Sequence, residues 1–319
     1  MLFRSVAWLT GSQKKKERQQ MLAAIESGEA VLVVGTHAVI QHDVHFHRLG
    51  LAIIDEQHRF GVEQRLSLRR KTQHAAASEG VQEPHMLMMS ATPIPRTLAM
   101  AHYADLDVST LNELPPGRTP VVTRTISDAR RAELLQRMRS QISEGRQVYW
   151  VCPLIEESEA LDLSNATETH QQLTRALNTD PAQPVLVGLL HSRMPPAEKK
   201  AVMALFTSGA MAVLVSTTVI EVGVDVPNAS LMVIEHAERF GLSQLHQLRG
   251  RVGRGASASA SACVLLYSLG EHGRLSDTAR ERLRAMLETH DGFEIARRDL
   301  AIRDRKSTRL NSSHIPLSR

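Results

Sequence analysis

Residues 51–58 read Leu-Ala-Ile-Ile-Asp-Glu-Gln-His, a short apolar run that ends in two adjacent carboxylates. A run of this length predicts a buried strand of a parallel sheet. Ligands of such sheets bind beyond the carboxyl ends of the strands, which is where Asp55 and Glu56 are expected. There Asp55 can hold Mg²⁺ through water, and Glu56 can orient and deprotonate an attacking water. By itself the dipeptide indicates only a charged strand end before a loop.

Outward from this strand, short apolar runs alternate with helical patterns, which predicts an α/β fold with parallel sheets. The polar stretch at residues 161–184 is interpreted as a surface insertion. Helices are expected at residues 14–27, 128–144, 195–207, 271–288 and 293–302. Strands are expected at residues 31–36, 51–55, 86–90, 121–126, 147–153, 185–190, 211–216, 231–235 and 262–267.

Three prolines and a glycine within residues 114–120 predict a linker, because such a segment continues neither a helix nor a central strand. The expected organisation is a first domain at 1–113, a second at 121–268, a helical hairpin at 269–303 and a tail at 304–319.

The composition narrows the class of protein. The net charge of +4 and the pI near 9.3 are compatible with a polyanionic partner. Aromatic residues make up only 3%, which favours a grip on the phosphate backbone over a base-stacking platform. Cys152 and Cys263 lack the spacing of a zinc site or a disulfide framework, and a reducing cytoplasm fits them. Neither a signal peptide nor an apolar run of membrane-spanning length is present in the sequence.

Two further motifs follow apolar runs. In Ser90-Ala91-Thr92, the hydroxyls of Ser90 and Thr92 can couple a phosphate sensor to a neighbouring domain, although an ordinary Ser/Thr/Pro turn explains the motif too. Within residues 215–227, Thr217 and nearby backbone N–H groups can bind DNA phosphates, while Gly223 and Asp225 face a nucleotide. The alternative for the second motif is a buried β-rich segment with a turn at Gly223.

Residues 244–255 read Gln-Leu-His-Gln-Leu-Arg-Gly-Arg-Val-Gly-Arg-Gly. Arg251 and Arg254 are spaced so that both can reach one triphosphate, and an arginine finger is worth roughly 10³–10⁵ in rate. Gln247 and Gly250 are expected at the same nucleotide. The alternative is a basic loop that touches nucleic acid or solvent.

These four elements occur in the order and spacing of superfamily 2 helicases, and the chain most closely resembles the C-terminal motor half of the RecG family. Residues 35–40 (Gly-Thr-His-Ala-Val-Ile) resemble that family's DNA-contacting motif, which implies DNA contacts at Gly35, Thr36 and His37. Residues 55–65 (DEQHRFGVEQR) look like its DExH box, with His58 in the catalytic set. Residues 90–97 (SATPIPRT) and 246–255 (HQLRGRVGRG) also resemble motifs of that family.

Residues 271–303 resemble the helical hairpin of the translocation motif that RecG shares with the transcription-repair coupling factor, which implies coupling roles for Arg297 and Arg298. The resemblance implies two RecA-like domains, the first truncated at its N-terminus, with a nucleotide cleft between them. It also implies ATP-driven, Mg²⁺-dependent translocation on branched double-stranded DNA, which remodels stalled forks and Holliday junctions. A monomer in the bacterial cytoplasm, associated with the nucleoid, is expected.

The chain departs from the family in three ways. It contains no GxxxxGK[ST] phosphate loop, it lacks the wedge domain, and residues 304–319 bear no likeness to the family. We interpret the chain as a fragment, with the tail as an artefact of a truncated reading frame or an assembly, and expect no ATPase activity from it alone. The rival hypothesis is a non-catalytic DNA-binding or assembly fragment. An RNA helicase is disfavoured by the hairpin.

Two weaker signals are interpreted as structural. His42, Asp43, His45 and His47 form a cluster that suits a surface loop better than a metal site. The methionines at 86, 88 and 89 are expected in a core rather than at a soft-metal site.

Overall fold

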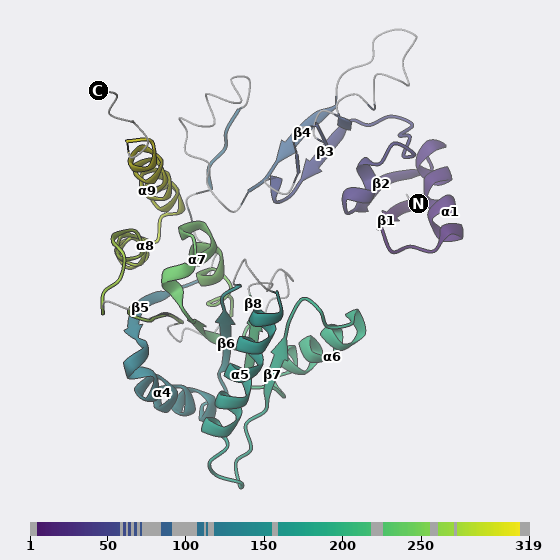
Figure 1. Ribbon diagram of the computed structural model, residues 1–319. Helices are drawn as coiled ribbons and strands as arrows, with labels where there is room; N and C mark the ends of the chain where they lie inside the picture. The colour runs from purple at the N-terminus through teal and green to yellow at the C-terminus, as the bar shows by residue number, and fades with distance from the viewer. Residues whose placement is uncertain are drawn as a thin grey trace. The chain divides into compact units, whose positions relative to one another are not determined.

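The computed structural model of the chain contains two compact units, Met1–Ala91 and Thr92–Arg319 (Figure 1). It describes residues 5–57, 60–61, 63–64, 67–68, 71, 84–90, 107–111, 113, 118–154, 159–217, 226–255, 261–270 and 273–312. Most of the predicted linker lies outside these residues, and the domain limits drawn from the sequence stay predictions.

The first unit consists of two pairs of parallel strands and one longer helix. Its described elements are β1 (Ser5–Leu9), α1 (Lys15–Glu26), β2 (Ala30–Gly35), the 3-10 helix η1 (His37–Ile40), β3 (Leu51–Ile54) and β4 (His85–Met88). β1 pairs with β2 and β3 pairs with β4. Alternation along β1 turns Ala7 and Leu9 toward Ile25 of α1, and these three side chains are buried together. Gly28 ends the helix region with a φ of 77°, a conformation that favours glycine.

The second unit is built on a parallel sheet of six described strands in the order β5-β10-β9-β6-β8-β7. This confirms the predicted α/β class and the parallel pairing. The strands are β5 (Val122–Ser127), β6 (Gln147–Cys152), β7 (Val187–Leu190), β8 (Val213–Thr217), β9 (Ala229–Ile234) and β10 (Ala262–Tyr267). The helices are α4 (Arg131–Ser143), α5 (Glu159–Leu177), α6 (Pro196–Thr207), α7 (Leu242–Arg249), α8 (Asp277–Glu288) and α9 (Gly292–Ser312), with the 3-10 turns η4 (Asp128–Arg130) and η5 (Ala237–Arg239).

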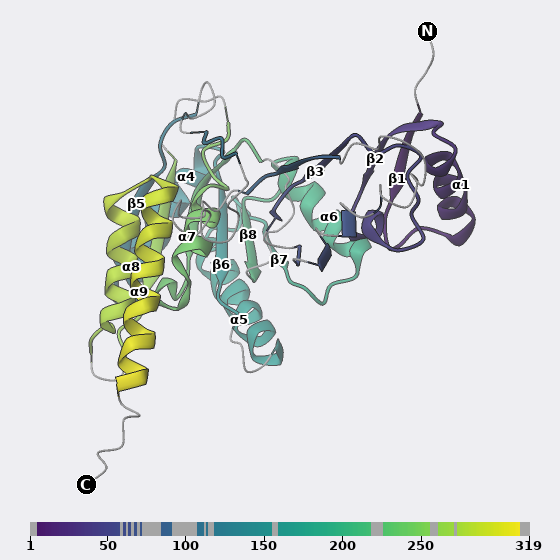
Figure 2. The ribbon, with the colours of Figure 1, turned by 90° about the horizontal axis from the view of Figure 1, so that it is seen from above.

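Helices cover both faces of this sheet, which explains why its central strands are almost continuously apolar (Figure 2). On one face Trp150 and its strand neighbours pack with α4 and α5. On the other face Tyr149 and its neighbours pack with α6, α7, α8 and α9. Each face therefore has its own core, and successive residues of a strand belong to opposite cores.

The stretch predicted as a surface insertion is a helix that forms part of the core, so that prediction was wrong. Most of it is α5, in which Ala166, Leu173 and Leu177 are buried against the sheet. Only a narrow apolar stripe faces inward, and the polar residues between its members hid it in the sequence. Strand β1 was not predicted at all.

The predicted helical hairpin is present as α8 and α9, which lie side by side (Figures 1 and 2). Its first helix begins later than expected, at Asp277, because Ser276 caps it by accepting a hydrogen bond from the N–H of Ala279. The second helix runs on to Ser312, past the predicted end at 302.

Candidate functional site

The two carboxylates lie where the sequence predicted them, directly after the last residue of β3. Asp55 is exposed, and its Oδ1 accepts the N–H of Glu56 at 2.8 Å. Glu56 is half-buried and has a φ of 51°. Among the described residues only Glu56 and His236 combine a side chain with positive φ, a backbone state that costs on the order of 1–3 kcal/mol. Strain of this kind is typical of functional turns.

The turn at residues 55–57, called the carboxylate turn below, is hydrogen-bonded to the segment that ends β4. The N–H of Gln57 donates to the carbonyl oxygen of Met89 at 3.0 Å, and the N–H of Met89 donates to that of Ile54 at 2.8 Å. Ser90, the first residue of the predicted coupling motif, follows Met89 directly. His58, Ala91 and Thr92 lie outside the described residues, so their predicted roles stay predictions.

The predicted DNA-contacting residues lie at the carboxyl end of β2. Gly35 is required there, because a Cβ atom would come within 2.2 Å of the Leu9 carbonyl oxygen. The N–H of Thr36 donates to the same oxygen at 3.1 Å. His37 is exposed at the start of η1, and its ring stacks on that of Phe60, with centroids 4.4 Å apart and planes 15° from parallel. The stack joins this motif to the loop that follows the carboxylates.

The histidine-rich loop is held by basic side chains. Arg18 forms an ion pair with Asp43 at 2.9 Å, and Lys71 donates to the carbonyl oxygens of Gln41 and Val44. Burial lowers the pKa of Lys71. Within the part of the chain that the structure describes, no three His, Cys, Asp or Glu side chains are grouped as metal ligands.

The arginine motif begins in α7 and continues into a glycine-rich loop. Gln247 is half-buried on the helix, and Gly250 follows its last residue. Arg251 is half-buried, whereas Arg254 is exposed and its Nε donates to the Gly250 carbonyl oxygen at 3.0 Å. Arg118 donates to the same oxygen at 2.8 Å. The structure therefore places both predicted arginines on one short loop.

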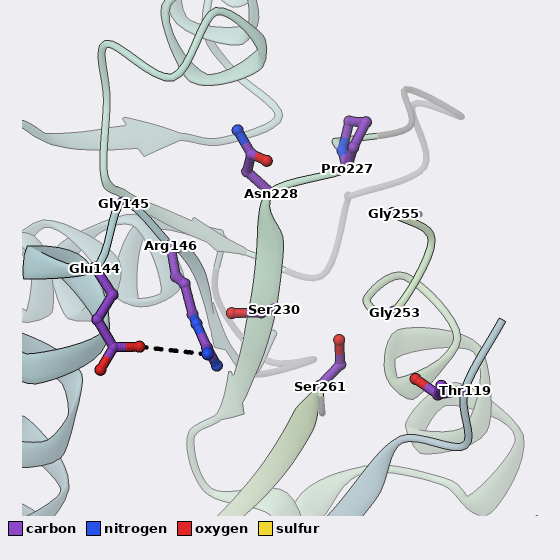
Figure 3. Close-up of a pocket in the computed structure, with 10 residues that line it drawn as sticks. All are labelled: Thr119, Glu144, Gly145, Arg146, Pro227, Asn228, Ser230, Gly253, Gly255 and Ser261. Atoms are coloured by element: carbon purple, nitrogen blue, oxygen red, sulfur yellow. Dashed lines mark ion pairs between the residues drawn. The ribbon is translucent and has the colours of Figure 1, made fainter. Parts of the chain in front are cut away.

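The glycines of this loop form one wall of a polar cavity of about 300 Å³ (Figure 3). Gly253 has a φ of 76°, and a Cβ atom at Gly255 would lie 2.3 Å from the Pro227 carbonyl oxygen. The remaining lining comes from Ser230, near the start of β9, and from residues that precede β5, β6, β9 and β10: Thr119, Glu144, Gly145, Arg146, Pro227, Asn228 and Ser261. The cavity thus lies at the amino ends of these strands.

Arg249 of the same motif stabilises the fold instead, and the sequence did not reveal this role. Arg249 is buried, and its guanidinium donates to the carbonyl oxygens of Met286 at 3.0 Å and Thr289 at 3.1 Å, at the carboxyl end of α8. It also contacts Nδ1 of His246 at 3.1 Å. Burial, and then the charge of Arg249, lower the pKa of His246 to about 4. Arg249 therefore ties the arginine-motif helix to the hairpin.

Thr217, predicted to bind DNA phosphate, is the last residue of β8 and is 3% exposed. Among the described residues, the buried hydroxyls of Ser216 and Thr217 have no hydrogen-bond partner. In this conformation the Thr217 hydroxyl faces the protein interior, so its phosphate contact stays a prediction. Gly223 and Asp225 lie outside the described residues.

The predicted coupling residues of the hairpin differ in their contacts. Arg297 pairs with Glu294 of its own helix. Arg298 bridges the two helices, donating to Glu294 at 2.7 Å and to Glu288 of α8 at 2.6 Å.

A second buried charge that the motifs did not reveal lies at the carboxyl end of β9. Glu235 is 8% exposed; it accepts the indole N–H of Trp150 at 2.9 Å and the hydroxyl of Thr169 at 3.2 Å, and pairs with Arg131. Burial raises the pKa of Glu235, but the charge of Arg131 and the bond from Trp150 outweigh it, so the pKa lies below its ordinary value. Its partners lie 66 to 104 residues away along the chain.

Comparison with known proteins shows which families this chain is similar to. Residues 2–101 match the DEAD/DEAH box helicase family and residues 129–256 match the helicase conserved C-terminal domain. These matches and the parallel sheet define helicase domains of the RecA-like fold. A structure of Mycobacterium smegmatis helicase Lhr, at 16% identity and a TM-score of 0.58, shows the same fold over 90% of this chain and 37% of that one.

More specific similarity points to one branch of these helicases. ATP-dependent DNA helicase RecG of Escherichia coli K12 is 57% identical over 300 residues, and that of Haemophilus influenzae 53%; each match covers 93% of this chain and 41% of the relative. The structure of RecG bound to a three-way DNA junction aligns with a TM-score of 0.66 and 42% identity, covering 92% of this chain and 36% of that one. The chain belongs to the RecG family, and spans about two fifths of the length of these curated relatives. None of its described helices is long and apolar enough to cross a membrane.

Proposed function

We propose that this chain carries the motor of an ATP-dependent DNA helicase that moves on branched double-stranded DNA, at stalled forks and Holliday junctions. The carboxylate pair in its strained turn at the end of β3 is the observation that carries the proposal. A relative whose structure holds a three-way DNA junction supports the choice of substrate. We further propose a monomer that works in the bacterial cytoplasm, at the nucleoid.

In the proposed reaction Glu56 orients the attacking water and takes its proton. Asp55 fits the role of a Mg²⁺ ligand, because it is an exposed carboxylate beside the turn and an oxygen donor, which this cation prefers. Bound Mg²⁺ would neutralise charge on the β- and γ-phosphates. Arg251 and Arg254 stabilise the charge that develops on the transferred phosphoryl group, with Gln247 and Gly250 beside the nucleotide.

Movement on DNA is proposed to depend on the contacts of α7. Arg249 attaches this helix to the carboxyl end of α8, so a displacement of the arginine motif reaches the hairpin through a buried side chain. Arg298 then keeps α8 and α9 together. Residues 35–37 and the region of Thr217 supply the DNA contacts, chiefly to phosphates.

A second candidate for the 319-residue chain by itself is DNA binding without catalysis. The observation that favours it is the absence of a GxxxxGK[ST] motif from the sequence. Such a loop supplies backbone N–H donors and a lysine to the phosphates, and neither Glu56 nor the arginines replace those contacts.

One experiment tests both candidates. ATP turnover with branched DNA is measured for the chain alone and for a chimera that adds the part of E. coli RecG preceding the matched region. We expect DNA-stimulated turnover from the chimera only. Glu56→Gln in the chimera should abolish turnover and leave ATP binding intact, whereas Glu26→Gln, an exposed control on α1, should change neither.

Turnover by the chain alone that disappears with Glu56→Gln would contradict the non-catalytic candidate. Near-normal turnover in the Glu56→Gln chimera would contradict the role of Glu56 as the base.

A further inference from the structure

An aromatic contact joins the predicted DNA-contacting segment to the catalytic turn. His37 begins η1, two residues after the last residue of β2, and Phe60 follows the carboxylate turn. Their rings are stacked, 4.4 Å apart between centroids and only 15° from parallel. Because His37 is exposed, a ligand that reaches this end of β2 also reaches one partner of the stack.

Phe60 is in turn attached to the backbone that carries Glu56. Its N–H donates to the Gln57 carbonyl oxygen at 3.1 Å, and the N–H of Gln57 donates to Met89 at 3.0 Å. The preceding residue, Glu56, sits in the left-handed conformation with its N–H bound by Asp55. A turn held in a sparsely populated backbone state has neighbouring states close in energy, so a small shift at Phe60 can redirect the Glu56 carboxylate.

We propose that His37 and Phe60 are a positioning pair that transmits DNA contact at residues 35–37 to the turn holding Glu56. The pair sets the orientation of the proposed base and makes hydrolysis respond to DNA. The inference rests on the proposed DNA contact, and it specifies how that contact regulates the same site.

The test is hydrogen exchange of the whole 319-residue chain, with and without a short DNA duplex, while fluorescence anisotropy of the labelled duplex reports binding. We expect duplex to slow amide exchange at residues 35–40 and, through the stack, at residues 55–57, by on the order of fivefold or more at each. Phe60→Leu removes the ring, so slowing at 35–40 should remain while slowing at 55–57 is lost. Phe60→Tyr keeps a ring and should restore it.

Phe46→Leu is the matched control, because Phe46 is a half-buried ring that packs on the core of the same unit. It should leave DNA-dependent slowing at both segments. A merely structural role for Phe60 predicts faster exchange at 55–57 in Phe60→Leu with the response to DNA unchanged, which would overturn the proposal.

Binding by anisotropy with no slowing at 55–57 in the unmodified chain overturns the positioning pair alone, and this result needs no variant to fold. Absence of binding overturns the proposed DNA contact and the positioning pair together.

Discussion

Replacing Glu235 with glutamine should destabilise the second unit more than any comparable exposed change. The carboxylate accepts hydrogen bonds from Trp150 and Thr169 and pairs with Arg131, in the core between β6, β9, α4 and α5. Glutamine keeps one acceptor oxygen but removes the charge, which leaves the guanidinium of Arg131 without its buried partner.

The expected loss in the free energy of unfolding follows from these contacts. Hydrogen bonds to a charged group contribute about 1.5–3 kcal/mol each, and removing one member of a buried pair costs about 3–5 kcal/mol. Arg131 is 21% exposed and also lies 3.4 Å from Asp128, so part of its charge stays solvated. We therefore expect a loss of about 3 kcal/mol in the free energy of unfolding of this unit.

The assay is urea denaturation followed by far-UV circular dichroism and by the fluorescence of Trp150 in a Trp8→Phe background. With a urea dependence of about 2 kcal/mol per molar, the midpoint should fall by roughly 1.5 M. Glu133→Gln is the control, because Glu133 pairs with Arg130 at 2.6 Å on the surface, where such pairs contribute little. Equal midpoints for the two variants would refute the stabilising role of Glu235.

The pH dependence has a defined sign. Because the pKa of Glu235 is lowered in the folded protein, its stabilisation is fully present above the ordinary value of about 4.5 and is lost as pH falls through the folded value. As the pH falls below about 4.5, the free energy of unfolding of the Glu235→Gln variant should therefore approach that of the parent protein. A difference that stays constant down to pH 3 would contradict the electrostatic part of the reasoning.

Three further predictions concern the arginine motif and the hairpin. The pKa of His246 is lowered to about 4, so between pH 6.5 and 4 the unfolded chain binds more protons than the folded one. The free energy of unfolding should therefore fall by up to about 3 kcal/mol as the pH falls through that range. His246→Gln should flatten this dependence of stability on pH, and an unchanged dependence of the denaturation midpoint would contradict the prediction. In the chimera, Arg251→Ala or Arg254→Ala should reduce ATP turnover by roughly 10³-fold with little change in DNA affinity; if salt-dependent DNA binding is lost instead, the arginines grip DNA phosphates. Changing both Arg297 and Arg298 should reduce fork unwinding more than ATP hydrolysis. Arg298→Ala should be the more harmful single change, because Arg298 bridges α8 and α9 whereas Arg297 pairs within its own helix; equal losses in both assays would mean that the hairpin is only structural.

The sequence predicted the fold class and most strands, because the strands of a sheet covered on both faces are continuous apolar runs. It also predicted the carboxylate pair at the end of β3 and the family, because each motif is a run of consecutive residues that can be recognised without knowledge of the fold. It failed where local composition misleads. In α5 the buried apolar residues Ala166, Leu173 and Leu177 are spread among polar ones, and β1 was not recognised.

Only the tertiary structure decided what individual side chains of one string do. Arg249, Arg251 and Arg254 are alike in the sequence, but the end of α7 buries the first against α8 and leaves the last exposed. Glu235 and the stack of His37 on Phe60 depend on partners brought together from distant or separate segments. No local pattern encodes such contacts, because burial and hydrogen bonding at these positions depend on which elements the completed fold places beside them.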